Sequence, residues 1–443
     1  MTRVFYASTL YGAMSLAAAI DAGLFGDRGE RRLLIISDNT RAPEIGDPVD
    51  RVRGFEPLRH RFDEIVHWND VIAPMHPSRF VPRAAEVPML TLLIGEQLGL
   101  DEVSELVLES VAVAPARTIG SLIRECPITV YSDGLMSYGP TRDEIAVDLG
   151  RRIGRLLYLD LVPEISPLLL REYDVTPQAI PDSAFLKVVA ELPGPVVDGA
   201  VGAPVIIGQY LSQLEILTAG EEAALHDAMV RGLVSAGYRH VVFKPHPAAG
   251  RSHVRPLQET AARLGVRLTV AADGLPAEAW FAAARPELVV SCFSTALLTA
   301  RRYYDLPVAR TGTELALDRI TPYQNSNRIP ATIVDAVVPE LRPDGRLADP
   351  PRLELDQLVQ AVGFCMQAAR YPELREVASA YLATHGPRRY FKNRRLEAVG
   401  LVAPPAYRSA VVRRTAKLAV RAARRARDSA SAQRVSAAIA RQR

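Results

Sequence analysis

Short apolar runs with the length of buried strands alternate along the chain with stretches of helical periodicity. In the first half these runs lie at Val4–Ser8, Arg32–Ser37, Ser104–Leu108 and Ile128–Tyr131, and helices are predicted at Tyr11–Gly23 and Ala112–Ile123. The alternation resumes in the second half. Strands are predicted there at 204–208, 240–244, 267–271, 288–291 and 306–309, and helices at 221–236, 257–264 and 296–304. Apolar strands separated by helices are typical of parallel sheets covered by helices.

Prolines punctuate the region from about 162 to 204 and interrupt both periodicities, which is typical of a linker. We therefore predict an α/β protein with two Rossmann-like lobes facing across a cleft. The predicted domains are an N-terminal lobe (1–165), a linker (166–203), a C-terminal lobe (204–345), a helical region (346–403) and a tail (404–443). Within the helical region, Pro351–Tyr381 reads as a long helix that braces the lobes.

The charge of the chain is divided unevenly. The 443 residues contain 53 Lys and Arg against 50 Asp and Glu, a net charge of +3. Eleven basic residues and one acidic residue lie from Arg408 onward, so the tail carries +10 and the body −7. An acidic body is not that of a general nucleic-acid binder, and we expect no nucleic-acid partner.

Composition narrows the cellular setting. Cys126, Cys292 and Cys365 are far apart in the sequence, which argues against a disulfide scaffold and fits a reducing compartment. No apolar run approaches the roughly 18 residues of a membrane-spanning helix, and the N-terminal segment lacks a convincing signal-peptide pattern. We expect a cytoplasmic protein.

Ligands of open parallel sheets bind beyond the carboxyl ends of the strands, so polar residues at those positions are the candidates for chemistry. The first is the pair Asp133-Gly134 after the strand at 128–131. A carboxylate there can accept a proton from a bound hydroxyl, and the glycine leaves space for a substrate. The same pair is equally typical of a simple turn, because Asp-Gly recurs at 273 and 344.

The second candidate is the segment Lys244-Pro245-His246-Pro247, which ends an apolar strand. Two prolines hold the histidine in an extended, rigid presentation, which suits an imidazole that must donate a hydrogen bond or a proton. The lysine two positions earlier favours an anionic ligand. A rigid loop with an incidental histidine is the alternative.

The third candidate is the strand-to-helix junction that contains Ser291, Ser294 and Thr295. Hydroxyls beside the amides of a helix N-terminus can bind an anion, although they can equally serve only as helix caps. Gly208-Gln209, at the end of the strand at 204–208, is a weaker candidate. No P-loop, dinucleotide-binding glycine pattern, nucleophile elbow, D-x-D or H-E-x-x-H motif occurs, so we predict no cofactor and no metal.

In this order, the Asp-Gly, His-Pro and Ser-Thr elements resemble the (D/E)-(D/E)-G, H-P and S-[ST] motifs of the bacterial sialyltransferases. The α-2,8-polysialyltransferase type is the closest in appearance, and the Gly208-Gln209 strand end is also similar to it. The resemblance covers roughly residues 1 to 340 and implies a GT-B glycosyltransferase with an acceptor-side N-terminal lobe and a nucleotide-sugar-binding C-terminal lobe. The chain departs from the family at Ser132, where a second acid is usual.

The resemblance implies an inverting, metal-independent transfer from a CMP-activated acidic sugar to a cell-envelope glycan. Asp133 would be the general base, and His246 would protonate or hydrogen-bond the leaving phosphate. Ser294 and Thr295 would hold that phosphate, and the substrate-binding set is completed by Gly134, Gly208, Gln209, Lys244, Pro247 and Ser291. A histidine, hydroxyls and helix amides can neutralise a phosphate without a metal.

Three other functions share parts of this pattern. Kdo transferases and CDP-polyol phosphotransferases also carry a strand followed by Lys-Pro-His-Pro and a serine-rich junction. A non-catalytic nucleotide- or glycan-binding protein could use the same cleft. A comparison of CMP, CDP-glycerol and UDP-sugar binding distinguishes these alternatives.

The basic tail has its own periodicity. On a helical wheel six basic residues share one sector, and an alanine-rich apolar face fills the other. The six are Arg413, Arg414, Lys417, Arg421, Arg424 and Arg425. Such a helix can lie on an anionic membrane surface, which would place the protein on the inner face of the cell membrane as a peripheral protein. A solvated Ala/Arg tail is the alternative.

Overall fold

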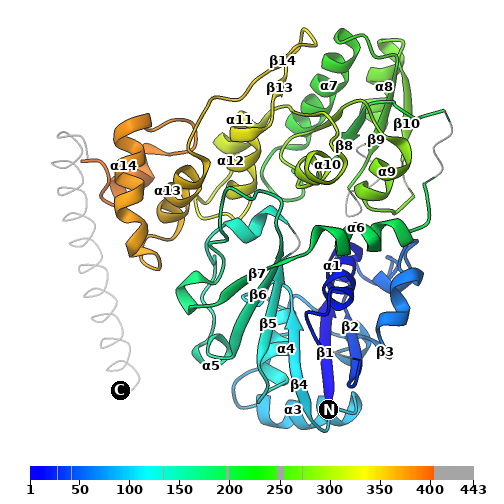
Figure 1. Cartoon of the computed structure of the whole chain (residues 1–443), viewed down its shortest axis with the longest axis vertical. Helices are drawn as coiled ribbons and strands as arrows, with labels where there is room; N and C mark the ends of the chain where they lie inside the picture. Colours follow the sequence, from blue (N-terminus) through cyan, green and yellow to red (C-terminus); the bar gives the residue numbers. More distant parts are fainter. Residues whose placement is uncertain are drawn as a thin grey trace, which may run out of the picture. The chain divides into compact units, whose positions relative to one another are not determined.

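The computed structural model describes residues 1–26, 28–40, 42–132, 134–195, 199–246, 254–271 and 273–403 (Figure 1). Two of the predicted site residues, Asp133 and Pro247, lie outside the described residues, as does the tail 404–443. The chain divides into two compact units, Met1–Tyr390 and Phe391–Arg443. The described part of the second unit contains one helix, α15 (Asn393–Ala398).

The first unit contains two seven-stranded sheets. The first sheet has the order β3-β2-β1-β4-β5-β6-β7, and every pair of neighbours is parallel. Its strands are β1 (Thr2–Ala7), β2 (Arg31–Ile36), β3 (Glu64–His67), β4 (Val103–Leu108), β5 (Ile128–Ser132), β6 (Ile153–Leu159) and β7 (Thr176–Ile180). The helices of this lobe are α1 (Leu10–Asp21), α2 (Trp68–Val71), α3 (Val87–Gln97), α4 (Ala116–Leu122), α5 (Val147–Gly150) and α6 (Asp182–Glu191), with 3-10 turns η1 (Val49–Arg51), η2 (Glu56–Arg61), η3 (Leu135–Tyr138) and η4 (Arg171–Tyr173).

The second sheet has the order β10-β9-β8-β11-β12-β13-β14 and is parallel except for its last pair. Its strands are β8 (Val205–Ile207), β9 (His240–Lys244), β10 (Arg267–Val270), β11 (Val289–Ser291), β12 (Val308–Arg310), β13 (Glu340–Leu341) and β14 (Leu347–Ala348). The remaining helices are α7 (Ala219–Ser235), α8 (Val254–Arg263), α9 (Ala277–Ala284), α10 (Ala296–Tyr304), α11 (Thr313–Arg319), α12 (Arg328–Val337), α13 (Leu355–Gln367) and α14 (Arg375–His385), with the 3-10 turn η6 (Pro372–Leu374).

Both sheets are buried on two faces, as their apolar strands predict. Val4 to Ala7 of β1 and Val241 and Val242 of β9 have no exposed surface. Strands covered on both sides by helices give the doubly wound arrangement, so the prediction of two Rossmann-like lobes is confirmed. The three cysteines are buried and carry no disulfide.

The segment 166–203, predicted as a linker, differs from that prediction because it contains β7 and α6. β7 pairs with β6 alone and forms the edge of the sheet. An edge strand tolerates a proline because one side of its backbone needs no ladder partner, and Pro177 lies within β7. A proline that suggested a linker in the sequence therefore belongs to an edge strand.

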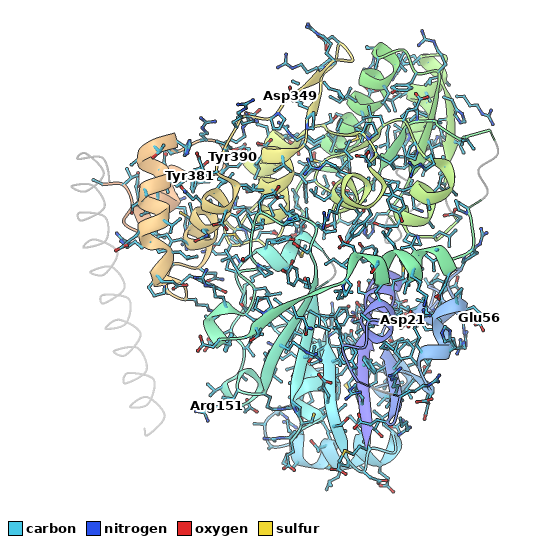
Figure 2. All side chains as sticks on the ribbon, viewed as in Figure 1. Asp21, Glu56, Arg151, Asp349, Tyr381 and Tyr390 are labelled. Atoms are coloured by element: carbon cyan, nitrogen blue, oxygen red, sulfur yellow. The ribbon has the colours of Figure 1, made fainter. Side chains whose placement is uncertain are left out.

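Helix α6 is held against the N-terminal lobe by a buried ion pair. Arg61 is only 3% exposed, and its Nη2 lies 2.6 Å from Asp21 Oδ2 and 2.9 Å from Glu191 Oε2. Asp21, at the end of α1, is labelled in Figure 2. Two carboxylates therefore compensate the buried guanidinium and join α1, η2 and α6.

The predicted long helix at Pro351–Tyr381 is divided in two. α13 ends at Gln367, and a turn at Pro372 precedes α14, because proline disfavours the helical conformation at the residue before it. Tyr371 lies in this break and is fully buried. Its hydroxyl donates to Leu168 O at 2.9 Å and accepts from Thr141 N at 3.1 Å. The break thus ties the helical region to the N-terminal lobe.

Candidate functional site

His246 follows β9 at its carboxyl end, as predicted. Its ring is half-buried and lies against Tyr210, with 4.2 Å between the ring centroids. Burial, followed by the nearby charge of Lys244, lowers the pKa of His246 to about 4. The imidazole is therefore neutral near pH 7, with one N–H that can donate a hydrogen bond and one nitrogen that can accept one.

Lys244 occupies the last position of β9 and is 5% exposed. Its Nζ lies 3.4 Å from Asp273 Oδ1, and burial lowers its pKa while Asp273 raises it. Trp280 Nε1 donates to Asp273 Oδ2 at 2.7 Å and orients that carboxylate. Lys244 is thus a buried charge at the end of β9. Its partner Asp273 belongs to an Asp-Gly pair that is typical of a simple turn.

Gly208 and Gln209 follow β8, the neighbour of β9. A Cβ at position 208 would lie 2.9 Å from Phe243 Cζ and 3.3 Å from Lys244 O, so a larger side chain there would crowd β9. Gln209 Oε1 accepts a hydrogen bond from Phe293 N at 2.9 Å, and Ser291 Oγ lies 3.4 Å from it. Gln209 therefore joins the ends of β8 and β11.

Ser291 is fully buried, and its hydroxyl donates to Ile207 O at 2.8 Å. The geometry makes it a link between β11 and β8. It was predicted to bind substrate, but the structure gives its hydroxyl a structural bond, because the side chain of a central strand points into the lobe.

Ser294 and Thr295 lie where α10 begins. Ser294 Oγ accepts from Ala296 N at 3.2 Å. The next amides are also bonded within the turn, since Leu297 N donates to Ser294 O at 3.1 Å and Leu298 N donates to Thr295 O at 2.8 Å. The Ser294 hydroxyl therefore accepts from the first amide of α10, and the N-cap residue Thr295 makes no side-chain cap bond. The amides expected to bind an anion have internal partners.

The two lobes meet at Thr295. Its Oγ1 lies 3.4 Å from Leu135 N, and a Cβ at Gly134 would lie 3.0 Å from the same oxygen. The glycine after Asp133 thus permits the loop beyond β5 to contact the start of α10. Gly134 and Thr295, 161 positions apart in the sequence, are side by side in the fold.

The predicted residues of the C-terminal lobe follow three neighbouring strands, β9, β8 and β11. Their carboxyl ends share one edge of the sheet, so His246, Gln209 and Ser294 lie along it. The strand order reverses between β8 and β11, which is the position where open sheets bind ligands. Sequence reasoning missed Tyr210 and Asp273. The position of Tyr210 directly after Gln209 was a usable signal for it, whereas only the fold pairs Asp273 with Lys244.

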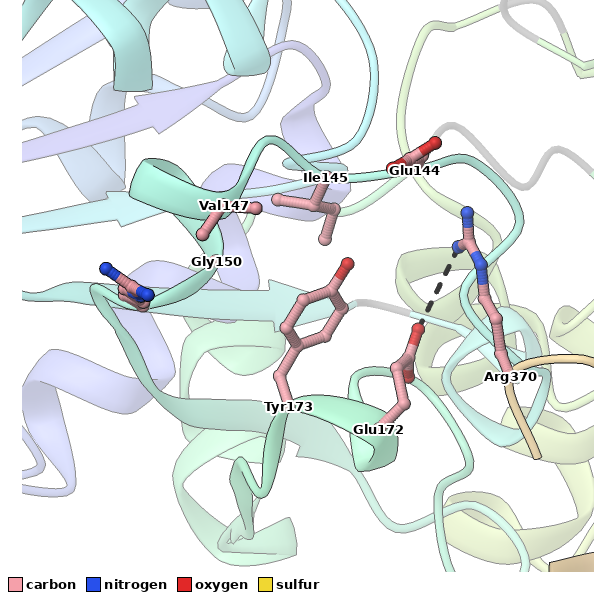
Figure 3. A pocket seen from close by; sticks show the side chains of 8 residues that line it. Glu144, Ile145, Val147, Gly150, Glu172, Tyr173 and Arg370 are labelled. Carbon is pink, nitrogen blue, oxygen red and sulfur yellow. Dashed lines mark ion pairs between the residues drawn. The ribbon is translucent and has the colours of Figure 1, made fainter. Parts of the chain in front are cut away.

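Two pockets lie elsewhere in the first unit. One, of about 550 Å³, is shown in Figure 3, where Glu172 faces Arg370 at 3.9 Å. The other, of about 830 Å³, is lined by residues that include Arg301, Arg302 and Glu354. None of the predicted site residues lines either pocket.

Within the described ranges, no group of three or more His, Cys, Asp and Glu side chains is arranged to hold a metal ion. In the same ranges, no helix combines the length and the apolarity needed to cross a bilayer.

The sequence of this chain matches a known protein family. Residues 3–313 match the family model described as alpha-2,8-polysialyltransferase. No curated protein matches the sequence.

Several solved structures align with the chain at low similarity. A Listeria monocytogenes protein named for UDP-N-acetylglucosamine 2-epimerase aligns with 11% identity and a TM-score of 0.47, covering 85% of this chain and 97% of that one. A Photobacterium damselae sialyltransferase GT-B domain aligns with 13% identity and a TM-score of 0.40, covering 75% and 95%. An E. coli heptosyltransferase aligns with 13% identity and a TM-score of 0.34, covering 70% and 88%. The assignment to a family rests on the sequence match.

Proposed function

This chain belongs to the alpha-2,8-polysialyltransferase family, and we propose that it transfers a CMP-activated acidic sugar of the sialic-acid type to a cell-envelope glycan. As a member of that family it is a glycosyltransferase, which takes a nucleotide-sugar donor and a glycan acceptor. In this proposal the donor is CMP-linked, the transfer inverts the anomeric carbon, and neither a metal nor another cofactor takes part.

In the proposed reaction, the Asp133 carboxylate accepts the proton of the acceptor hydroxyl. The oxygen then attacks the anomeric carbon, and the bond from that carbon to the phosphate oxygen breaks, so that CMP leaves with the electron pair. A single displacement inverts the anomeric carbon. A neutral His246 donates a hydrogen bond to the leaving phosphate. The negative charge of that phosphate raises the pKa of the imidazole, so the ring takes up a proton from solvent, and the resulting imidazolium can protonate the phosphate.

One observation supports this proposal most, the contact between Thr295 and the Gly134–Leu135 loop. It brings the loop that follows Asp133 in one lobe against the Ser-Thr junction in the other. A base on the acceptor side and a phosphate-holding element on the donor side must be this close for a direct transfer. Lys244, the imidazole of His246 and the hydroxyls of Ser294 and Thr295 supply charge and donors without a metal.

We further propose a cytoplasmic location, on the inner face of the membrane where envelope glycans are built. The +10 tail would bind anionic lipid there, and the −7 body gives no reason to expect a nucleic-acid partner.

The test measures which nucleotide raises the melting temperature, because a ligand that binds the folded state stabilises it. We expect CMP to stabilise the protein and CDP-glycerol and UDP-sugars to do so less. Incubation with CMP-sialic acid should then release CMP, both with and without a glycan acceptor. Preference for CDP-glycerol would favour a polyol phosphotransferase. Binding of CMP with no turnover of the CMP-sugar would favour a non-catalytic binding protein.

A further inference from the structure

The N-terminal sheet has its own reversal of strand order, between β1 and β4 (Figure 1). Strands β2 and β3 lie beyond β1, and β5 to β7 lie beyond β4, so the loops after β1 and β4 diverge. Open parallel sheets bind ligands in the crevice that such a divergence leaves. Ser8 and Thr9 follow β1 here, and Glu109 follows β4.

Hydroxyl groups of the protein converge on the Glu109 carboxylate. Ser8 Oγ donates to Glu109 Oε1, and the Tyr131 hydroxyl lies 3.2 Å from Glu109 Oε2 and 3.0 Å from Tyr6 O. Glu109 is half-buried. Glu109 thus accepts hydrogen bonds from hydroxyl groups, which are also the groups that a sugar presents. A substrate hydroxyl can add to the Ser8 and Tyr131 donors or replace them.

Glu109 lies beside the first turn of helix α1. Thr9 caps this helix by accepting a hydrogen bond from Gly12 N at 2.9 Å. Glu109 Oε2 would lie 3.4 Å from a Cβ placed on Gly12, so the carboxylate is beside the first turn, where the helix dipole stabilises negative charge. Burial and the Glu109 charge raise the pKa of Tyr6. An ionised carboxylate attracts hydroxyl donors and repels phosphate, unlike the site in the C-terminal lobe.

Glu109 follows the strand next to the one whose loop contacts the other lobe. β5 borders β4, at the usual spacing of about 5 Å between strands. The loop after β5 is the one that touches Thr295. A sugar bound at Glu109 would therefore lie one strand away from the loop that touches the C-terminal lobe.

We propose that Ser8 and Glu109 form the subsite for the terminal sugar of the acceptor, with Glu109 accepting hydrogen bonds from its hydroxyls. This inference rests on the proposed glycosyl transfer. It assigns Glu109 to binding the acceptor, and Asp133 remains the base. Specificity in this subsite favours a neutral polyhydroxyl portion of the acceptor over its acidic groups.

The test replaces Glu109 by Gln, which keeps the shape and removes the charge. With CMP-sialic acid and a short α-2,8-linked oligosialic acid as probes, E109Q should raise the acceptor KM about tenfold or more, the range for a hydrogen bond to a charged group. The kcat should change less than about threefold, and the donor KM should not change. S8A should raise the acceptor KM by a smaller factor. Asp38, beyond the neighbouring strand β2, provides the matched control D38N, which should leave both KM values unchanged.

Measuring the release of CMP with and without acceptor distinguishes failure of the proposed function from failure of the proposed subsite. If the wild-type chain turns over no CMP-sugar with or without acceptor, the proposed function fails. If turnover is normal and E109Q leaves the acceptor KM unchanged, the subsite is overturned. A lower kcat at an unchanged acceptor KM would also overturn it, because Glu109 would then act in the chemistry. If E109Q melts well below the wild type, S8A decides, and an unchanged acceptor KM there overturns the proposal.

Discussion

The hydroxyl oxygen of Thr295 lies 3.4 Å from the backbone nitrogen of Leu135, so a side chain at the start of α10 in one lobe receives an amide from the loop after β5 in the other. Ser294, one residue earlier, has its hydroxyl oxygen bonded within its own lobe, to Ala296 N. The two adjacent hydroxyl residues therefore have different roles. Of these two residues, Thr295 is the one whose side-chain hydrogen bond joins the lobes.

Replacing Thr295 by Val should therefore impair transfer more than replacing Ser294 by Ala. Both variants lose a hydroxyl proposed to hold phosphate, but T295V also leaves Leu135 N without its partner, at about 0.5–1.5 kcal/mol. We expect T295V to lower kcat up to about tenfold more than S294A at similar CMP affinity, with T295S close to wild type. Steady-state kinetics and calorimetry with CMP measure both quantities. Equal kcat values for T295V and S294A would show that the contact between the lobes does not contribute to transfer.

Replacing Asp133 by Asn or Ala should remove transfer but preserve CMP binding. Loss of a general base lowers the rate about 10²–10⁴-fold, and the proposed CMP site is in the other lobe. Transfer to a glycan acceptor and the CMP-induced rise in melting temperature are the two measurements. Asp101, an exposed residue before β4, serves as the matched control D101N. Substantial transfer by D133A would contradict the assignment of the base.

The stability of the protein should depend on pH through His246. Its pKa is about 4 in the folded chain, below its ordinary value of 6.5, so the unfolded chain binds more protons between these values. Stability from this group is present above pH 6.5 and is lost as the pH falls toward 4. The full loss is at most about 3 kcal/mol.

Urea unfolding at pH 7 and at pH 4.5 measures this effect. H246Q should lose less stability than the wild type over that interval, since its side chain does not titrate. An identical pH dependence in the two proteins would show that the imidazole titrates normally in the folded state.

Gln209 should stabilise the junction between β8 and β11. Q209A leaves the buried Phe293 amide without its acceptor, which costs about 1–3 kcal/mol and lowers the melting temperature by several degrees. Q209E keeps an acceptor oxygen but adds a negative charge beside the proposed phosphate site. It should fold better than Q209A yet bind CMP weakly.

Gln213, exposed in the same loop, gives the control Q213A, which should match the wild type in melting temperature and CMP affinity. Equal melting temperatures for Q209A and Q213A would contradict a structural role for Gln209.

Removal of residues 404–443 should abolish binding to anionic vesicles and leave transfer to a soluble acceptor unchanged. The tail contributes about 1 kcal/mol per basic residue near an anionic surface, and salt screens this attraction. Co-sedimentation with phosphatidylglycerol vesicles, at low and high salt, measures it, and phosphatidylcholine vesicles are the control. Undiminished binding by the truncated chain would assign membrane attachment elsewhere.

Local pattern predicted much of the fold. The strand at His240–Lys244 and the helix at Ala296–Tyr304 have the predicted bounds, because an apolar run of strand length and a capped helical stretch are local signals. The edge strand β7 was missed because Pro177 obscured its pattern, and β6 was not predicted. In a sequence, a proline suggests a break in secondary structure. Only the strand order shows that β7 lies at the edge of its sheet, where a proline is tolerated.

The sequence by itself determined which polar residues follow buried strands, and so which side chains can reach a ligand at the edge of each sheet. Only the tertiary structure decided what each of them does. It assigned the Ser291 hydroxyl to Ile207 and paired Lys244 with Asp273. It also placed Glu109 beside Ser8 and brought Gly134 against Thr295. The periodicity of a chain records which residues are buried, whereas contacts between residues far apart in the sequence depend on strand order and on how the lobes pack.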